Sequence, residues 1–162
     1  MNLYTITTSI VINATPEKIW PFLCHAKLPL TAPCWFRMGV PTPERCQLLS
    51  EVGSVGAKRQ CVTSRGRINQ EITEWIENKK LSFEVIDDSV GLKRCFTSMK
   101  DTFLLESLSE TDTRLTRITT FQPRGLAGNV KALFLGLVVK KIHRYVMKNF
   151  KTLAENKSTA LS

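Results

Sequence analysis

The sequence is poor in the residues from which metal and nucleophile centres are built. It has only two histidines, and its five cysteines lie far apart, with no CxxC pair and no Cys/His cluster at zinc spacing. It also lacks a glycine-rich phosphate loop and the HExxH, GxSxG and EF-hand patterns. These absences argue against zinc, calcium and nucleotide sites and against a serine hydrolase. We therefore expect a protein without a metal or a cofactor.

Segments that enter membranes are missing as well. The longest nearly continuous apolar run, residues 132–139, is far shorter than the roughly 20 residues of a membrane-spanning helix. Residues 1–12 have neither the basic start nor the long apolar core of a signal peptide. Because the cysteines are dispersed and odd in number, we expect them to act as small buried apolar side chains and not to form a disulfide framework. The sequence thus predicts a cytoplasmic protein whose cysteines are reduced: Cys24, Cys34, Cys46, Cys61 and Cys95.

Acidic residues are in the minority. The 23 Lys and Arg residues outnumber the 14 Asp and Glu residues, which gives a formal charge of +9. Such a charge permits contact with anionic membranes, nucleic acid or acidic ligands, but a lysine-rich solvated surface is the simpler interpretation. The basic residues are scattered and no aromatic stacking platform accompanies them, so we expect no nucleic-acid binding. No feature of the sequence indicates an oligomeric state.

The chain is long enough for one domain with a sizeable core, which we assign to residues 1–157. Alternating apolar residues predict a first strand over 4–12, and Thr15-Pro16-Glu17 predicts the start of a short helix over 15–25. The proline-rich stretch 28–43 predicts a connection that packs on the core or closes over a ligand. Strands without intervening helices then indicate an antiparallel meander, over residues 47–51, 57–64, 67–77, 81–86, 97–106 and 114–121.

A long helix is predicted over residues 128–156, followed by a tail at 158–162. Its first half is apolar on all sides, which predicts that its start is buried and its end emerges. Its second half is amphipathic. One side carries an apolar stripe of Ile142, Val146, Phe150 and Leu153, and the other side carries the basic residues Lys140, Lys141, Arg144, Lys148 and Lys151. This amphipathic pattern suggests weak association with an anionic membrane surface. A solvated basic face is the simpler interpretation, because the apolar stripe is needed to cover the sheet.

Alternation along the strands defines one inward face, which is mostly apolar. Its apolar members are Ile68, Ile72, Ile76, Leu81, Phe83, Val85, Met99, Phe103, Leu105, Leu115 and Phe121. It also carries the polar residues Gln70, Glu74, Asp101, Arg117 and Thr119. Because an unpaired buried polar group costs about 1–3 kcal/mol, these side chains are expected to pair with one another, to lie at wet strand ends, or to line a cavity. A β-bulge would reverse the assignments beyond it.

Three segments carry a family resemblance: residues 10–20 (IVINATPEKIW), residues 71–83 with EITEW and KLSF, and residues 113–119 (TRLTRIT). They are similar to segments of the START/Bet v 1-like superfamily, also called SRPBCC or the polyketide cyclase/dehydrase and lipid transport group. The resemblance spans residues 6–155. It implies an α+β helix-grip fold, in which a curved antiparallel sheet of about seven strands surrounds a long C-terminal helix, with one or more short helices after the first strand. It implies no catalytic residue, since only some members are enzymes.

The resemblance implies a cavity between sheet and helix that binds or transports a small hydrophobic ligand such as a lipid, polyketide or quinone. We predict that Arg117 or Gln70 meets the ligand's polar end, within a lining of Gln70, Phe83, Met99, Phe103, Arg117, Phe121, Leu133 and Leu137. An alternative is a polyketide cyclase/dehydratase-like enzyme, which needs an acid–base group near its substrate. Its candidates are Glu74, Asp101 and His143, although His143 is expected at the surface. A third interpretation is a peripheral membrane protein that handles lipids.

Overall fold

The structure is a computed structural model that describes residues 2–125 and 128–159, with residues 128–129 and 157–159 as backbone only. Eight strands form one antiparallel sheet in the order β1-β8-β7-β6-β5-β4-β3-β2. The strands are β1 Tyr4–Ile12, β2 Ala26–Lys27, β3 Pro43–Leu48, β4 Lys58–Thr63, β5 Gly66–Ile76, β6 Lys80–Asp88, β7 Phe96–Ser107 and β8 Thr113–Pro123. The helices are α1 Pro16–Cys24, the 3-10 helix η1 Cys34–Met38, α2 Leu92–Cys95 and α3 Gly128–Thr159.

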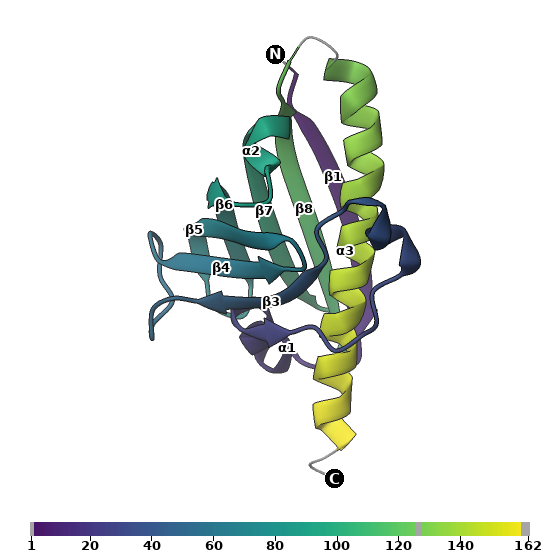
Figure 1. Cartoon of the computed structure of the whole chain (residues 1–162). Coiled ribbons are helices and arrows are strands. Elements are labelled where there is room, and N and C mark those ends of the chain that lie inside the picture. Colours follow the sequence, from purple (N-terminus) through teal and green to yellow (C-terminus); the bar gives the residue numbers. More distant parts are fainter. Residues whose placement is uncertain (1, 126–127, 160–162) are drawn as a thin grey trace.

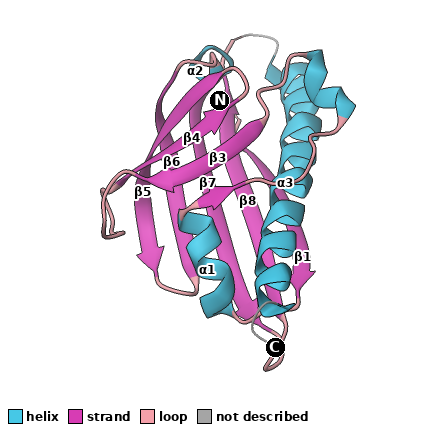
Figure 2. Ribbon diagram, turned by 60° about the horizontal axis from the view of Figure 1, so that its bottom comes forward, coloured by secondary structure: helices cyan, strands magenta, loops and turns pink. Residues whose placement is uncertain are grey.

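The sheet curls, and α3 runs along it beside β1 and β8 (Figure 1). The short helix α1 lies next to α3 on the same side of the sheet (Figure 2). The main core fills the space between α1, α3 and the strands with fully buried side chains such as Ile19, Leu23, Phe83, Phe103 and Phe150. The helix-grip fold predicted from the sequence is thereby confirmed. One strand more than expected is present, because the two-residue β2 pairs with β3.

The predicted connection 28–43 packs against α3 through η1. Phe36 is buried and meets Tyr145 edge-on, with ring centroids 5.1 Å apart. Trp35 stacks on Phe36 at 3.9 Å, and the Lys141 ammonium lies 5.1 Å from the Trp35 centroid. The Tyr145 hydroxyl donates to the Leu30 carbonyl at 2.9 Å. These contacts attach the connection 28–43 to the surface of α3.

The exposure of α3 is the reverse of the sequence prediction. Its second half is buried through Val146, Met147 and Phe150, whereas its first half exposes apolar side chains. The cause is the position of the first half over β1, which is an edge strand of the sheet. A helix on an edge strand can bury only one side. That side includes Gly136, where an added Cβ would lie 3.1 Å from Ile6 Cδ1, so the Ile6 side chain packs closely on the helix backbone.

The helix backbone continues to Thr159, past the predicted end at residue 156. Residues 160–162 of the predicted tail lie outside the described residues. No helix in the described part of the chain is long and apolar enough to cross a membrane.

A bulge in β5 overturns the inward assignment of Glu74. The pairing of β5 with β6 shifts register between Ile72 and Glu74, so the side chains after Ile72 change face. Glu74 lies on the outer face, where it accepts hydrogen bonds from Lys80 Nζ at 2.8 Å and Ser82 Oγ at 2.7 Å. Trp75 takes the inward position and meets Trp20 of α1 at 5.0 Å. Ile76 is exposed for the same reason.

The prediction that all cysteines are reduced is wrong for two of them. Cys46 and Cys61 form a disulfide between β3 and β4. They sit directly opposite each other in the antiparallel pair, with Cα atoms 4.1 Å apart. That pairing follows from the strand register and is not visible in the spacing of five dispersed cysteines. Cys24, Cys34 and Cys95 are free, and burial raises the pKa of the Cys24 thiol to about 11.

Candidate ligand cavity

A cavity of about 100 Å³ lies between the sheet and the second half of α3. Since one water molecule occupies about 30 Å³ in the liquid, the cavity has room for roughly three waters. Most of its wall is apolar, and its polar side chains come from β4, β5, β7 and β8. It is lined by Pro41, Pro43, Cys46, Arg59, Cys61, Thr63, Ile68, Gln70, Phe83, Val85, Leu92, Met99, Asp101, Phe103, Arg117, Ile142 and Val146.

Of the residues predicted to line a ligand site, Gln70, Phe83, Met99, Phe103 and Arg117 line this cavity. The structure does not bring the other three predicted residues there. Phe121, Leu133 and Leu137 instead line a separate groove between β1 and the first half of α3. The predicted site is therefore divided, because α3 contacts the sheet directly along β1 and leaves space only farther along its length.

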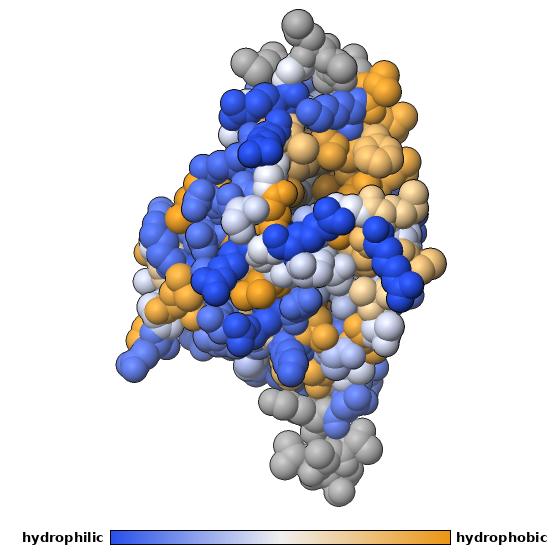
Figure 3. Space-filling model, viewed as in Figure 1, coloured by the Kyte–Doolittle hydropathy of each residue, from blue (hydrophilic) through white to orange (hydrophobic). Residues whose placement is uncertain are grey.

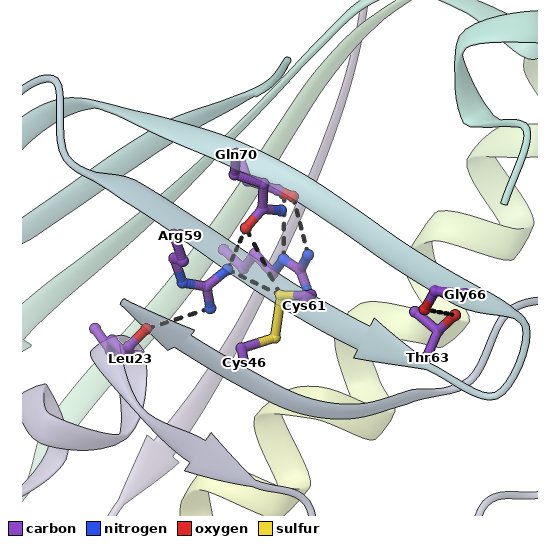
Figure 4. Close-up of a disulfide and its surroundings, with 9 residues drawn as sticks. Leu23, Cys46, Arg59, Cys61, Thr63, Gly66 and Gln70 are labelled. Carbon is purple, nitrogen blue, oxygen red and sulfur yellow. Dashed lines mark hydrogen bonds and ion pairs between the residues drawn. A yellow bond between two sulfur atoms is a disulfide. The ribbon is translucent and has the colours of Figure 1, made fainter. Parts of the chain in front are cut away.

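Arg59, which was not predicted, is the most unusual group in the cavity wall. Its side chain is almost wholly buried, and its guanidinium lies 4.4 Å from the centroid of the Phe83 ring. It donates hydrogen bonds to the Gln70 side chain and, at 3.3 Å, to the Leu23 carbonyl, above the Cys46–Cys61 disulfide (Figure 4). Its Nε atom has no hydrogen-bond partner among the described residues.

No carboxylate of the described residues lies within 4.0 Å of the Arg59 guanidinium. Burial, together with the neighbouring charge of Arg117, lowers the pKa of Arg59 to about 10. That value still leaves the group charged at neutral pH. Arg59 is thus a buried cation whose charge is balanced by no direct partner.

Asp101 and Arg117 form a second charged group in the same wall. Arg117 Nε and Nη2 lie 3.2 and 3.0 Å from the two oxygens of Asp101, and the Thr119 hydroxyl donates to Oδ1. Burial acts to raise the pKa of Asp101, but Arg117, His143 and the Thr119 hydrogen bond outweigh it and hold the pKa below its usual value. Asp101 is therefore ionised. Two guanidinium groups and one carboxylate leave the cavity wall with one positive charge in excess.

Comparison with known proteins places the chain in a family. The family described as polyketide cyclase / dehydrase and lipid transport matches residues 4–155. The chain belongs to this family. No curated protein sequence matches it. The resemblance stated from the three sequence segments is confirmed.

Three solved structures with this fold share little sequence with the chain. The Zhui aromatase/cyclase from Streptomyces sp. R1128 is 11% identical with a TM-score of 0.70, over 97% of this chain and 96% of the other. The major latex-like protein 151 from Panax ginseng is 13% identical with a TM-score of 0.63, over 93% and 96%. Norcoclaurine synthase from Thalictrum flavum is 11% identical with a TM-score of 0.65, over 96% and 88%. At these identities the likeness establishes the fold alone.

His143 lies in the interior of this family member, and the prediction that it is at the surface is wrong. Its ring is fully buried, with Nδ1 2.8 Å from Thr8 Oγ1 and Nε2 2.5 Å from Thr119 Oγ1. Burial and the charge of Arg117 lower its pKa to about 3, so the ring is neutral. Because ionised Asp101 can only accept, Thr119 donates to it and accepts from Nε2–H, which leaves Nδ1 to accept from Thr8. His143 thus connects α3 to β1 and β8.

The three acid–base candidates do not meet in the cavity. Glu74 is on the outer face of the sheet, and His143 lies among the strands β1 and β8 rather than in the cavity lining. Asp101 lines the cavity, but both of its oxygens are engaged by Arg117 and Thr119. The arrangement is suited to holding a ligand by charge and shape more than to moving protons.

We expect His143 to make the protein sensitive to mild acid. In the unfolded chain its pKa returns to about 6.5, so the unfolded state takes up a proton below that pH and the folded state does not. The stability that comes from keeping His143 neutral is therefore fully present above pH 6.5 and is lost as the pH falls below that value. The free energy of unfolding should be about 2 kcal/mol lower at pH 5 than at pH 7, measured by urea denaturation.

The matched control is His25, the other histidine, which is exposed. His25→Gln should retain the pH dependence between pH 5 and 7, whereas His143→Gln should flatten it. An unchanged slope in His143→Gln would show that this dependence comes from another group.

Proposed function

We propose that the protein binds a small apolar molecule that carries an anionic end. The observation that supports this most directly is the buried, unbalanced Arg59 in a mostly apolar cavity. An isolated charge in an apolar interior is costly unless it is paired. A ligand carboxylate or similar anion would supply the missing partner, and its apolar body would lie against side chains such as Phe83, Met99, Ile142 and Val146.

The assignment of the polar end differs from the sequence prediction. Arg117 already has a two-point contact with Asp101, so its charge is satisfied. Gln70 is held by Arg59 and is neutral. Arg59 is therefore the group with capacity for an anion, and Gln70 would position it. The cavity of about 100 Å³ takes in only a small ring or a short acyl segment, so the chain of a ligand such as octanoate would extend toward its mouth.

Calorimetric titration with octanoate and with octanol at neutral pH tests the proposal. A hydrogen bond to a charged group contributes about 1.5–3 kcal/mol, so octanoate should bind at least about tenfold more tightly than octanol. Equal affinities would reject the anionic end but retain an apolar ligand. Failure of both compounds to bind, together with no small molecule in native mass spectra of the purified protein, would reject ligand binding in this cavity.

Cyclisation or dehydration of a polyketide-like substrate is the second candidate. The fold of the Zhui aromatase/cyclase and the description of the family suggest it. In this cavity Arg59 would stabilise an oxyanion of the substrate, and Asp101 would be the carboxylate nearest to it. Turnover of a model polyketide that survives in Arg59→Met would count against this candidate, since no other unpaired cation lines the described cavity.

A further inference from the structure

The first half of α3 presents one apolar side to solvent. Val130, Leu133, Phe134 and Leu137 are 57–80% exposed. Their spacing of three, one and three residues places them on one side of a helix. We call these four side chains the outer face of α3. Figure 3 shows a hydrophobic area, in orange, over the upper part of that helix. Monomeric proteins seldom expose a contiguous apolar area of this kind without a use for it.

The apolar area continues from the helix onto the edge of the sheet. A groove of about 540 Å³ runs between β1 and α3, lined by side chains that include Tyr4, Ile6, Phe121, Leu133 and Leu137. The opposite side of the helix is already occupied, since Ala132 and Val139 are buried against the sheet. No other part of the described chain therefore covers the outer face.

Basic residues follow the outer face along α3. Lys140, Lys141 and Arg144 are exposed within two turns of Leu137, and Lys140 lines the groove itself. The first acidic residue of α3 is Glu155, near the other end of the helix. An apolar surface bordered by cations and free of carboxylates is complementary to acyl chains beneath anionic head groups.

We propose that the outer face of α3 docks on an anionic membrane surface, with the helix lying in the plane of the head groups. The apolar side chains would enter the boundary of the acyl region while the lysines contact lipid phosphates. A second copy of the chain fits less well. A parallel symmetric pairing of the outer faces would bring the same basic residues of both copies together, and like charges repel. An antiparallel pairing would separate them but would offer them no carboxylate of α3 before Glu155.

Docking would place the ligand cavity close to the lipids. Ile142 lines the cavity and follows Leu137 by five residues on the same helix. Leu92 of α2 lines the cavity and also packs in the cluster that contains Ala132 and Val139. A ligand could then pass between bilayer and cavity over a short path. The docking itself does not depend on what the cavity binds.

Co-sedimentation with vesicles tests the proposal. The full chain should pellet with vesicles of phosphatidylcholine and phosphatidylglycerol, but much less with phosphatidylcholine alone or at high salt. Phe134→Asp should lower the partition coefficient at least about tenfold, because it puts a charge in place of an exposed apolar side chain that would enter the bilayer. The matched control is Ile76→Asp, which alters an exposed apolar residue at the far end of β5 and should bind as the parent does.

Two double charge reversals distinguish the effect of charge beside the outer face from the effect of the net charge of the protein. Lys140→Glu/Lys141→Glu and Lys18→Glu/Lys79→Glu change the net charge equally, and all four lysines are exposed. Only the first pair should reduce binding, by at least about tenfold. Equal loss in both pairs, or pelleting of Phe134→Asp at the parental level, would overturn the proposal. A dimer in light scattering that Phe134→Asp dissociates would overturn it too, and so would a lack of preference for anionic vesicles.

Discussion

Replacing Arg59 by methionine is expected to weaken octanoate binding by roughly 30- to 3,000-fold and to leave octanol binding within about threefold. Loss of one partner of a buried, hydrogen-bonded ion pair costs about 2–5 kcal/mol of binding free energy. Methionine is also long and unbranched, and its thioether can take the place of the guanidinium beside the Phe83 ring, so we expect the cavity to keep its shape. The measurement is calorimetric titration of both compounds into parent and variant.

Stability should respond to this substitution far less than binding does. Without ligand, Arg59 is a buried cation that lacks a carboxylate partner, and its removal eliminates a desolvation cost. We expect the free energy of unfolding of Arg59→Met to stay within about 1 kcal/mol of the parent value, or to rise. Arg67→Met on the neighbouring strand is the matched control, since that arginine is exposed and should affect neither quantity. Parental octanoate affinity in Arg59→Met would disprove an anion site at this residue.

Replacing Asp101 by asparagine is expected to lower the free energy of unfolding by about 3–5 kcal/mol, the usual cost of removing one partner of a buried ion pair. Asp101 is the only carboxylate among the described lining residues of the cavity. The substitution leaves Arg117 and Arg59 charged in an apolar interior without a counter-charge, and it replaces the oxygen that accepts from Arg117 Nη2 by an amide nitrogen or leaves Thr119 facing that nitrogen. Urea denaturation at neutral pH, followed by far-UV circular dichroism, measures the change.

Two further variants identify the origin of that loss. Adding Arg117→Met to Asp101→Asn removes the second charge and should restore a large part of the stability. Glu106→Gln breaks the exposed pair between Glu106 and Arg114 and should cost less than about 1 kcal/mol. If Asp101→Asn costs no more than Glu106→Gln, the buried pair is not a main stabilising element.

The sequence predicted the fold well because its periodicities are long and consistent. Strands β6, β7 and β8 alternate without interruption over most of their length, so their inward residues, including Phe83, Asp101 and Arg117, were assigned correctly. The assignment of Glu74 was wrong because a bulge changes the phase of alternation and leaves no mark in a single sequence. An apolar run such as residues 132–139 has no polar side, so it could not indicate which side faces solvent.

Two residues of the interior were missed although the sequence contains a signal for each. Arg59, Cys61 and Thr63 alternate along β4 with their neighbours and are all buried, so the period-two rule would place Arg59 inward. His143 lies between Val139 and Val146 at helical spacing, on the side that packs against the sheet. In both cases residue type suggested exposure, since arginine is rarely buried and basic residues flank the histidine. Tertiary pairing with Gln70 and with Thr119 overrides that preference.

The Cys46–Cys61 disulfide gives the cavity wall a property that depends on oxidation. It joins β3 to β4, and both sulfur-bearing residues line the cavity. Among the described strands, the sheet continues beyond β3 only as the two-residue β2, so β3 has a long strand on one side only. A covalent tie there suppresses local opening, which amide hydrogen exchange would detect as protection of β3 and β4 that a reductant removes. The cavity of the oxidised protein should accordingly be rigid. In the reduced protein, β3 and β4 should open locally more often, so that the cavity admits larger ligands.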